Sequence, residues 1–93
     1  MLRIRVEEKN HSVTLWLDGS LAGPHVAELE NCWAIVLAGL DDRGLAVNLD
    51  ALSFVDSRGK ALLSEIYSAG ARLKGKGAQS RFLVNEIQQR WTA

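Results

Sequence analysis

Four consecutive residues near the middle of the chain have types and spacing that could do chemistry: Asp56, Ser57, Arg58 and Gly59. They follow an apolar segment and precede an amphipathic one, a pattern that is typical of the start of a helix. Asp56 or Ser57 can accept a hydrogen bond from a backbone N–H of the first helical turn. This capping role accounts for both residue types, and it is the first of two interpretations of the motif.

The second interpretation makes Ser57 a phosphorylation site. The start of a helix presents unpaired N–H groups and the positive end of the helix dipole, and both favour a phosphate. Arg58 and Lys60 place two cations in the same turn, where they are unfavourable until an anion joins them. Asp56 opposes a phosphate by charge repulsion. We therefore predict that Ser57 is exposed and accepts a phosphate without unfolding of the domain.

Other catalytic and metal-binding patterns are missing from the sequence. The two histidines, His11 and His25, fall in different predicted elements, and neither has another good ligand beside it, so we expect no metal site and no cofactor. The segment 74–77 is basic and glycine-rich, but we expect it to close a helix, where it cannot hold a phosphate. A catalytic serine needs a base in contact with its hydroxyl, which the sequence does not indicate. We predict that the protein is not an enzyme.

Length and charge narrow the class of protein further. A chain of 93 residues is expected to form one domain spanning residues 1–93. Its formal net charge of zero argues against general nucleic-acid binding, which depends on phosphate neutralisation. The single cysteine, Cys32, excludes an internal disulfide, and the apolar runs are too short for a secretory signal or a membrane span. We expect a cytoplasmic protein with no membrane insertion.

The spacing of apolar residues predicts the elements that must position the motif. The predicted elements are strands at 2–6 and 13–17, a helix at 24–40, a strand at 45–49, a loop at 51–57, a helix at 57–74, a strand at 79–84 and a short helix from 86 to about 91. Trp33 lies on the apolar stripe of the first helix, so we expect it to be buried. The predicted order is β-β-α-β-α-β-α.

This order indicates a small α/β domain. The short link between the first two strands predicts an antiparallel hairpin, and the helical connections predict parallel strand pairs, so the sheet is mixed and mostly parallel. Alternation of apolar and polar residues in the hairpin indicates one wet sheet face, which places the helices mainly on the other. Trp16 points to the wet face with Arg3 and Arg5, where it either shields its own sheet or contacts a partner. We predict weak homodimerisation through this face.

The segment 45–59, the helix end at 70–77 and the glycine turn at 17–21 together resemble the STAS family of sulfate-transporter and anti-sigma-factor-antagonist domains. The resemblance implies a STAS-like fold over the whole chain. In that family the serine after the aspartate is phosphorylated by a partner kinase, and by motif position that serine is Ser57. The family thereby implies a bacterial, cytoplasmic regulator of transcription. Its unphosphorylated form binds an anti-sigma factor that is also the serine kinase, and phosphate breaks the complex.

Under this resemblance, four residues beside the serine are the candidate partner-binding residues: Asp56, Arg58, Gly59 and Lys60. An alternative keeps the fold without the phosphorylation. The chain would then be an accessory subunit that docks on a transporter or another complex, and Ser57 would only cap the helix. Many members of the family continue with another strand and helix where this chain ends, so we also expect an open sheet edge that a partner or a second copy covers.

Overall fold

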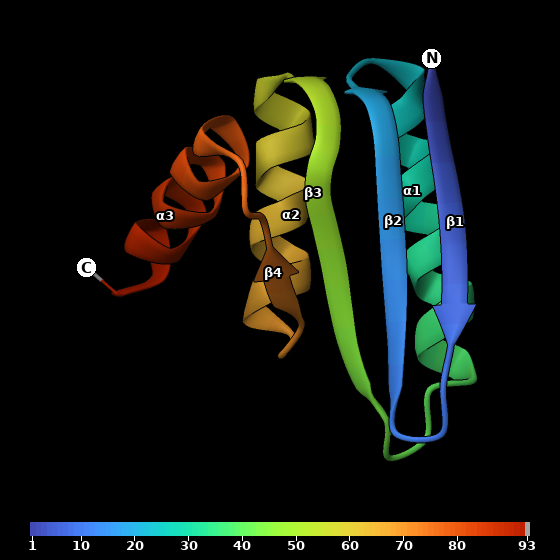
Figure 1. The fold of residues 1–93 in the computed structure, drawn as a ribbon. Coiled ribbons are helices and arrows are strands. Elements are labelled where there is room, and N and C mark those ends of the chain that lie inside the picture. Colours follow the sequence, from blue (N-terminus) through green and yellow to red (C-terminus); the bar gives the residue numbers. More distant parts are fainter. Residues whose placement is uncertain (93) are drawn as a thin grey trace.

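The computed structural model describes residues 1–92, with side chains up to Gln89. The elements in chain order are β1 (Leu2–Glu8), β2 (Ser12–Leu21), α1 (Pro24–Ala38), β3 (Gly44–Val55), α2 (Ser57–Ser68), β4 (Arg72–Lys74) and α3 (Ala78–Thr92). Figure 1 shows the four strands side by side, with the helices behind and beside them. The predicted order β-β-α-β-α-β-α is confirmed.

The four strands form one mixed sheet in the order β1-β2-β3-β4. β1 and β2 are antiparallel and are joined by a tight turn, in which the Lys9 N–H donates to the Ser12 carbonyl at 2.8 Å. β2 with β3 and β3 with β4 are parallel, because α1 and α2 carry the chain back between them. The mixed, mostly parallel sheet predicted from the sequence is therefore confirmed.

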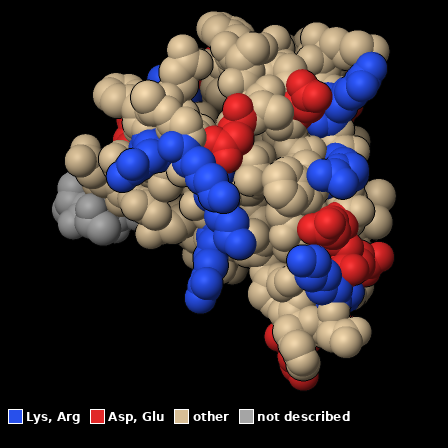
Figure 2. Space-filling view, viewed as in Figure 1, with Lys and Arg blue, Asp and Glu red and all other residues tan. Residues whose placement is uncertain are grey.

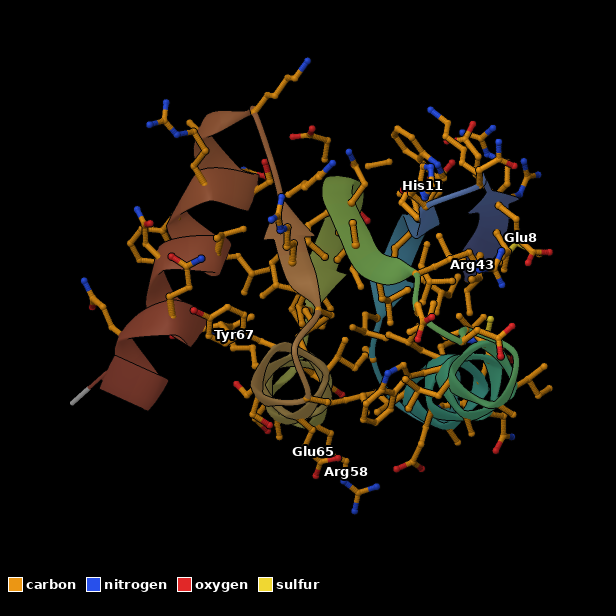
Figure 3. The ribbon with its side chains drawn as sticks, turned by 90° about the horizontal axis from the view of Figure 1, so that it is seen from below. Glu8, His11, Arg43, Arg58, Glu65 and Tyr67 are labelled. Atoms are coloured by element: carbon orange, nitrogen blue, oxygen red, sulfur yellow. The ribbon has the colours of Figure 1, made fainter. Side chains whose placement is uncertain are left out.

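The core lies between the sheet and the helices. Seen along the strands, α1 and α2 lie on the same side of the sheet, and α3 lies beyond β4 (Figure 3). Alternate residues of β2 point toward the helices and are buried, as their spacing predicts: Val13, Leu15 and Leu17. Helix α2 adds Leu63 and Ile66, both fully buried. The opposite face of the sheet is uncovered within the described residues, so the helices lie mainly on one face as expected.

The segment from residue 69 to residue 84 differs from the prediction. The second helix does not run to residue 74, because Gly70 adopts a φ of 107° just after its end. Residues 72–74 form β4 instead, with Leu73 buried between two exposed cations. The strand predicted at 79–84 is wrong, since this segment belongs to α3. This segment is helical because Leu83 and Ile87, four residues apart, lie on one face of α3, and Ile87 is almost fully buried.

Two further expectations need correction. The predicted loop at 51–57 is mostly strand, because β3 continues to Val55 and pairs with the whole of β2 through two register shifts. Trp33, expected to be buried, is only half-buried, and it packs against the core. The buried centre of the α1 stripe is Leu29, whereas Leu37 is 41% exposed. No helix in the described part of the chain is long and apolar enough to cross a membrane.

Candidate functional site

The Asp56–Gly59 motif lies at the end of the sheet where β2 and β3 finish together. The last residue pair of these parallel strands is Leu21 with Val55, and the next amide, that of Asp56, donates to the Leu21 carbonyl at 3.1 Å. Helix α2 begins immediately afterwards, at Ser57. The motif is therefore placed by two strands that must both end at this point, and the sequence prediction of a helix start here is confirmed.

Asp56 holds the beginnings of two helices. Its Oδ1 accepts a hydrogen bond from the Gly59 N–H at 2.7 Å, which caps α2. Its Oδ2 accepts from the Gly23 N–H at 2.9 Å, and Gly23 is the residue before α1. These two bonds, the Gly23 bond first, hold the pKa of the Asp56 carboxyl below its usual value. Asp56 is thus an ionised clamp between α1 and α2.

Gly59 is needed because the start of α2 approaches the end of β2 very closely. A Cβ at this position would lie 2.6 Å from the Leu21 carbonyl oxygen and 2.9 Å from Cγ1 of Val55. Gly59 is buried even though it belongs to the first helical turn. The first and last residues of the motif, Asp56 and Gly59, therefore have structural roles: Asp56 caps the helix, and Gly59 allows the close packing of α2 on β2.

Ser57 differs from its neighbours in the motif. It is the first residue of α2 and it is exposed. The cap is Asp56, and among the described residues the Ser57 hydroxyl has no hydrogen-bond partner. The capping interpretation thus applies to Asp56 alone, and the fold leaves the Ser57 hydroxyl available to solvent.

The two cations of the motif lie in different environments. Arg58 is exposed and points away from the sheet with Glu65, on the outer side of α2 (Figure 3). It lines a groove of about 410 Å³ between α1 and α2. Lys60 turns toward α3, where its Nζ lies 3.3 Å from Oε1 of Glu86. Lys60 therefore already has an anionic partner, and Arg58 is the cation left beside Ser57 within the described motif.

Two exposed phenylalanines near this end of the sheet were not singled out by the sequence analysis. Phe54, two residues before Asp56, is 57% exposed, and Phe82 on α3 is 72% exposed. Both line a second groove of about 250 Å³, together with Lys60 and Glu86. Phe82 had been assigned to a strand. Leu83 and Ile87 are spaced as one face of a helix, and Phe82 lies off that face. This spacing is the sequence pattern that could have predicted an exposed Phe82 on a helix.

Asp50 is a second aspartate whose role was missed. Its Oδ1 accepts hydrogen bonds from the Ser80 hydroxyl at 2.6 Å and from the N–H groups of Lys76 and Gly77 at 2.8 and 3.0 Å. These bonds, that of Gly77 first, lower the pKa of Asp50. The basic turn 74–77 therefore leads into α3, contrary to the prediction that it closes a helix. Two of its N–H groups, those of Lys76 and Gly77, are occupied by this carboxylate.

Trp16 lies apart from the motif, in the middle of β2 on the open face of the sheet. Its ring is half-buried, and the Arg5 guanidinium carbon lies 5.0 Å from the ring centroid. Figure 2 shows this face from the strand side, with Lys and Arg side chains gathered over β4 and others near β1. Along one row, Arg5, Trp16, Asn48 and Lys74 are paired across the four strands. The structure thus places Trp16 on the open face, as predicted, but beneath a cation.

The described residues contain no cluster of three or more His, Cys, Asp or Glu side chains that could hold a metal ion. Among the groups treated above, the arrangement offers a free hydroxyl at a helix start, an adjacent exposed guanidinium, two exposed phenyl rings and two shallow grooves. Such a surface suits docking by another protein and reversible modification.

Comparison with solved structures identifies the fold. An anti-sigma factor antagonist from Mycobacterium paratuberculosis matches with a TM-score of 0.81 at 18% identity, over 99% of this chain and 82% of that chain. The anti-sigma factor antagonist SpoIIAA in its unphosphorylated form matches with a TM-score of 0.62 at 19% identity, over 89% of this chain and 82% of that one.

A protein from Shewanella loihica with a SpoIIAA-like fold matches with a TM-score of 0.62 at 11% identity, over 99% of this chain and 79% of that one. No protein-family model and no curated protein matches the sequence. The arrangement of strands and helices nevertheless agrees along nearly the whole length, and the chain therefore has the STAS-like fold of these anti-sigma factor antagonists.

Proposed function

We propose that this STAS-like domain is a bacterial, cytoplasmic regulatory module that binds a protein partner around Ser57 and is released when Ser57 is phosphorylated. The partner is an anti-sigma factor that is also a serine kinase, as the resemblance implies. The observation that carries the proposal is that the residues of the motif have different roles. Asp56 and Gly59 hold the helix start in place, whereas the Ser57 hydroxyl is exposed and has no partner among the described residues.

The electrostatics of the site support modification without unfolding. A phosphate on Ser57 adds about −1.5 to −2 charges at neutral pH, at the positive end of the α2 dipole. Arg58 lies next in sequence and can pair with it, whereas Lys60 is engaged with Glu86. Both oxygens of Asp56 accept backbone N–H bonds, so that carboxylate stays in place and repels the phosphate. The phosphate is thereby directed outward, into the surface on which a partner docks.

The exposed apolar groups around the site favour a docking surface. Phe54 and Phe82 lie near the end of the sheet at which Ser57 begins α2, and a partner that covers them gains apolar burial. A doubly charged group beside such an interface costs desolvation energy unless the partner supplies a cation. Phosphorylation therefore weakens the binding of a partner that docks on the unmodified surface.

The test uses the purified chain and the serine-kinase-type anti-sigma factors encoded in the genome of origin. After incubation with ATP, mass spectrometry should find phosphate on Ser57 and none on Ser68, an exposed serine at the other end of α2. By calorimetry, Ser57→Ala should bind as the parent does, and Ser57→Asp should bind about tenfold more weakly. Ser68→Asp is the matched control and should bind like the parent.

Unchanged binding by Ser57→Asp, together with no phosphate on Ser57, would contradict the switch. If the chain instead binds a transport complex and the Ala and Asp variants bind it equally, the accessory-subunit alternative is correct. In that case Ser57 has no regulatory role, and Asp56 alone accounts for the motif.

A further inference from the structure

We propose that the free edge of β1 pairs with β1 of a second copy, which joins the two sheets into one across a twofold axis. This inference does not rest on the role of Ser57, because β1 is the edge of the sheet farther from α2 and α3 (Figure 1). It concerns the edge of the sheet and not the open face that carries Trp16.

The two edges of the sheet differ in how they are protected. β4 has only three residues and has α3 packed beside it, so that edge offers little room for another strand. β1 has seven residues and pairs with β2 in an unbroken register, without a bulge or a proline. Figure 1 shows no element beyond it within the described chain. A long, regular, uncovered edge is the kind that natural sheets normally block or pair.

The hydrogen bonds of the hairpin determine which residues face outward. Lys9 donates to Ser12 in the turn, so odd-numbered residues of β1 direct their N–H and C=O groups to β2. Even-numbered residues, from Ile4 through Val6 to Glu8, therefore direct theirs away from the sheet. Antiparallel pairing of two copies uses these outward groups, and it requires even residues to face even residues.

The charges of β1 select one register and indicate that the occupant is a second copy. When Val6 faces Val6 of the other copy, Arg5 faces Glu7 on both sides of the twofold axis. These two pairs fall at positions without backbone hydrogen bonds, where opposite side chains are closest. A register centred on Arg5 pairs Arg3 with Glu7 but places two arginines face to face on the axis, and one centred on Ile4 places Arg3 against Arg5. Within Leu2–Glu8, the Val6-centred register is the one of these three that pairs opposite charges without facing like charges.

The helix side of the same edge carries a groove with apolar side chains. This groove of about 560 Å³ lies between β1 and α1, and its apolar lining includes Val6, Cys32 and Ile35, whereas Glu8, Glu28, Asn31 and Arg43 are its polar and charged residues. Ile35 is 74% exposed and Val6 is 42% exposed, although both lie beside the core. In the Val6-centred register these groups gather around the twofold axis, so pairing removes them from water.

Glu8 is the one anion that this pairing would place against an apolar residue, since Ile4 of the other copy faces it. Its Oε1 is held 3.0 Å from Nη1 of Arg43, which also donates to carbonyls at the end of α1. Figure 3 shows Glu8 and Arg43 together beside β1. The carboxylate is therefore already neutralised and directed toward α1, away from the strand that would be added.

Sedimentation equilibrium of the purified chain tests the proposal. The average mass should rise from that of a 10.2 kDa monomer toward that of a dimer between about 10 µM and about 1 mM, the range expected for a small interface. Val6→Lys places two like charges on the axis and should raise the dimer Kd at least about tenfold. Phe82→Lys changes a more exposed apolar side chain on α3 and should leave the Kd unchanged.

Charge reversal tests the register. Arg5→Glu and Glu7→Arg should each weaken the dimer, because each creates two like-charge pairs, and the double variant should restore it. Circular dichroism melts of all variants confirm that they are folded. A parent that stays monomeric throughout the range would overturn the proposal. So would a dimer that Phe82→Lys disrupts as strongly as Val6→Lys, or a double variant that stays as weak as the single ones.

Discussion

Substitution of Gly59 by alanine tests whether the close approach of α2 to β2 sets the geometry of the Ser57 site. In an ordinary helix this change is stabilising by about 1 kcal/mol, because alanine is the better helix former. Here the added Cβ meets the Leu21 carbonyl oxygen at 2.6 Å, Cγ1 of Val55 at 2.9 Å and Cγ of Leu21 at 3.0 Å. The carbonyl oxygen cannot retract freely, since it accepts the Asp56 N–H at 3.1 Å.

The magnitude follows from these contacts. A backbone atom and two buried side-chain atoms must shift, which places the cost near the upper end of the overpacking range, at about 3 kcal/mol. The gain in helix propensity offsets about 1 kcal/mol of that. The net loss of about 2 kcal/mol should lower the Tm by roughly 8–16 °C in a domain of this size.

Thermal and urea denaturation, followed by circular dichroism, measure the effect. Gly39→Ala is the matched control, because Gly39 follows α1 and a Cβ there meets nothing within 4 Å. It should melt at or slightly above the parent temperature. A Gly59→Ala chain that melts within two or three degrees of the parent would show that α2 yields readily, and the argument for a fixed helix start would fail.

Three further outcomes follow from the structure. Ser57→Ala should change the free energy of unfolding by no more than about 0.5 kcal/mol, because the side chain is exposed and Asp56 provides the cap; urea denaturation measures it. Trp33→Ala should cost about 2–3 kcal/mol of unfolding free energy, less than a fully buried tryptophan, because Trp33 is only partly buried against the core, and a loss above about 4 kcal/mol would contradict this placement. The pKa values of Asp50 and Asp56 are lower in the folded chain than in the unfolded one. Their ionised forms therefore stabilise the folded state fully above about pH 5, and this stabilisation is lost as pH falls through the lowered pKa values. Melts between about pH 2 and pH 6 should show this loss, and Asp50→Asn or Asp56→Asn should each make the Tm less dependent on pH.

The sequence alone was sufficient wherever the determining interactions are local. Alternation in residues 2–6 and 13–17 predicted the hairpin, because both strands keep one face in the core and the turn between them is short. The helix start at residue 57 was equally predictable, since the capping bond from Gly59 to Asp56 spans three residues. The first five elements and the fold class follow from such local patterns.

The same local patterns failed between residues 69 and 84. A strand of three residues gives too short an alternation to distinguish from a helix end, and β4 exists because Leu73 pairs with Val47 of β3. The helical identity of α3 depends on Ile87 filling the core beside α2, which residues 79–84 by themselves do not indicate. Tertiary packing overrode the local preference in both places.

The details of the candidate site depend on contacts that are distant in sequence. The sequence identified Asp56 and Ser57 as alternative caps, and the fold assigned the cap to Asp56 by adding a second bond from Gly23, 33 residues away. It likewise paired Lys60 with Glu86, 26 residues away, and left Arg58 as the cation beside the serine. The sequence determined which chemical groups this turn contains. Which of these groups have partners and which face the solvent was decided only by the tertiary structure, where the ends of β2 and β3 meet the starts of α1 and α2. The reason is that a hydroxyl is exposed only if no other part of the fold covers it.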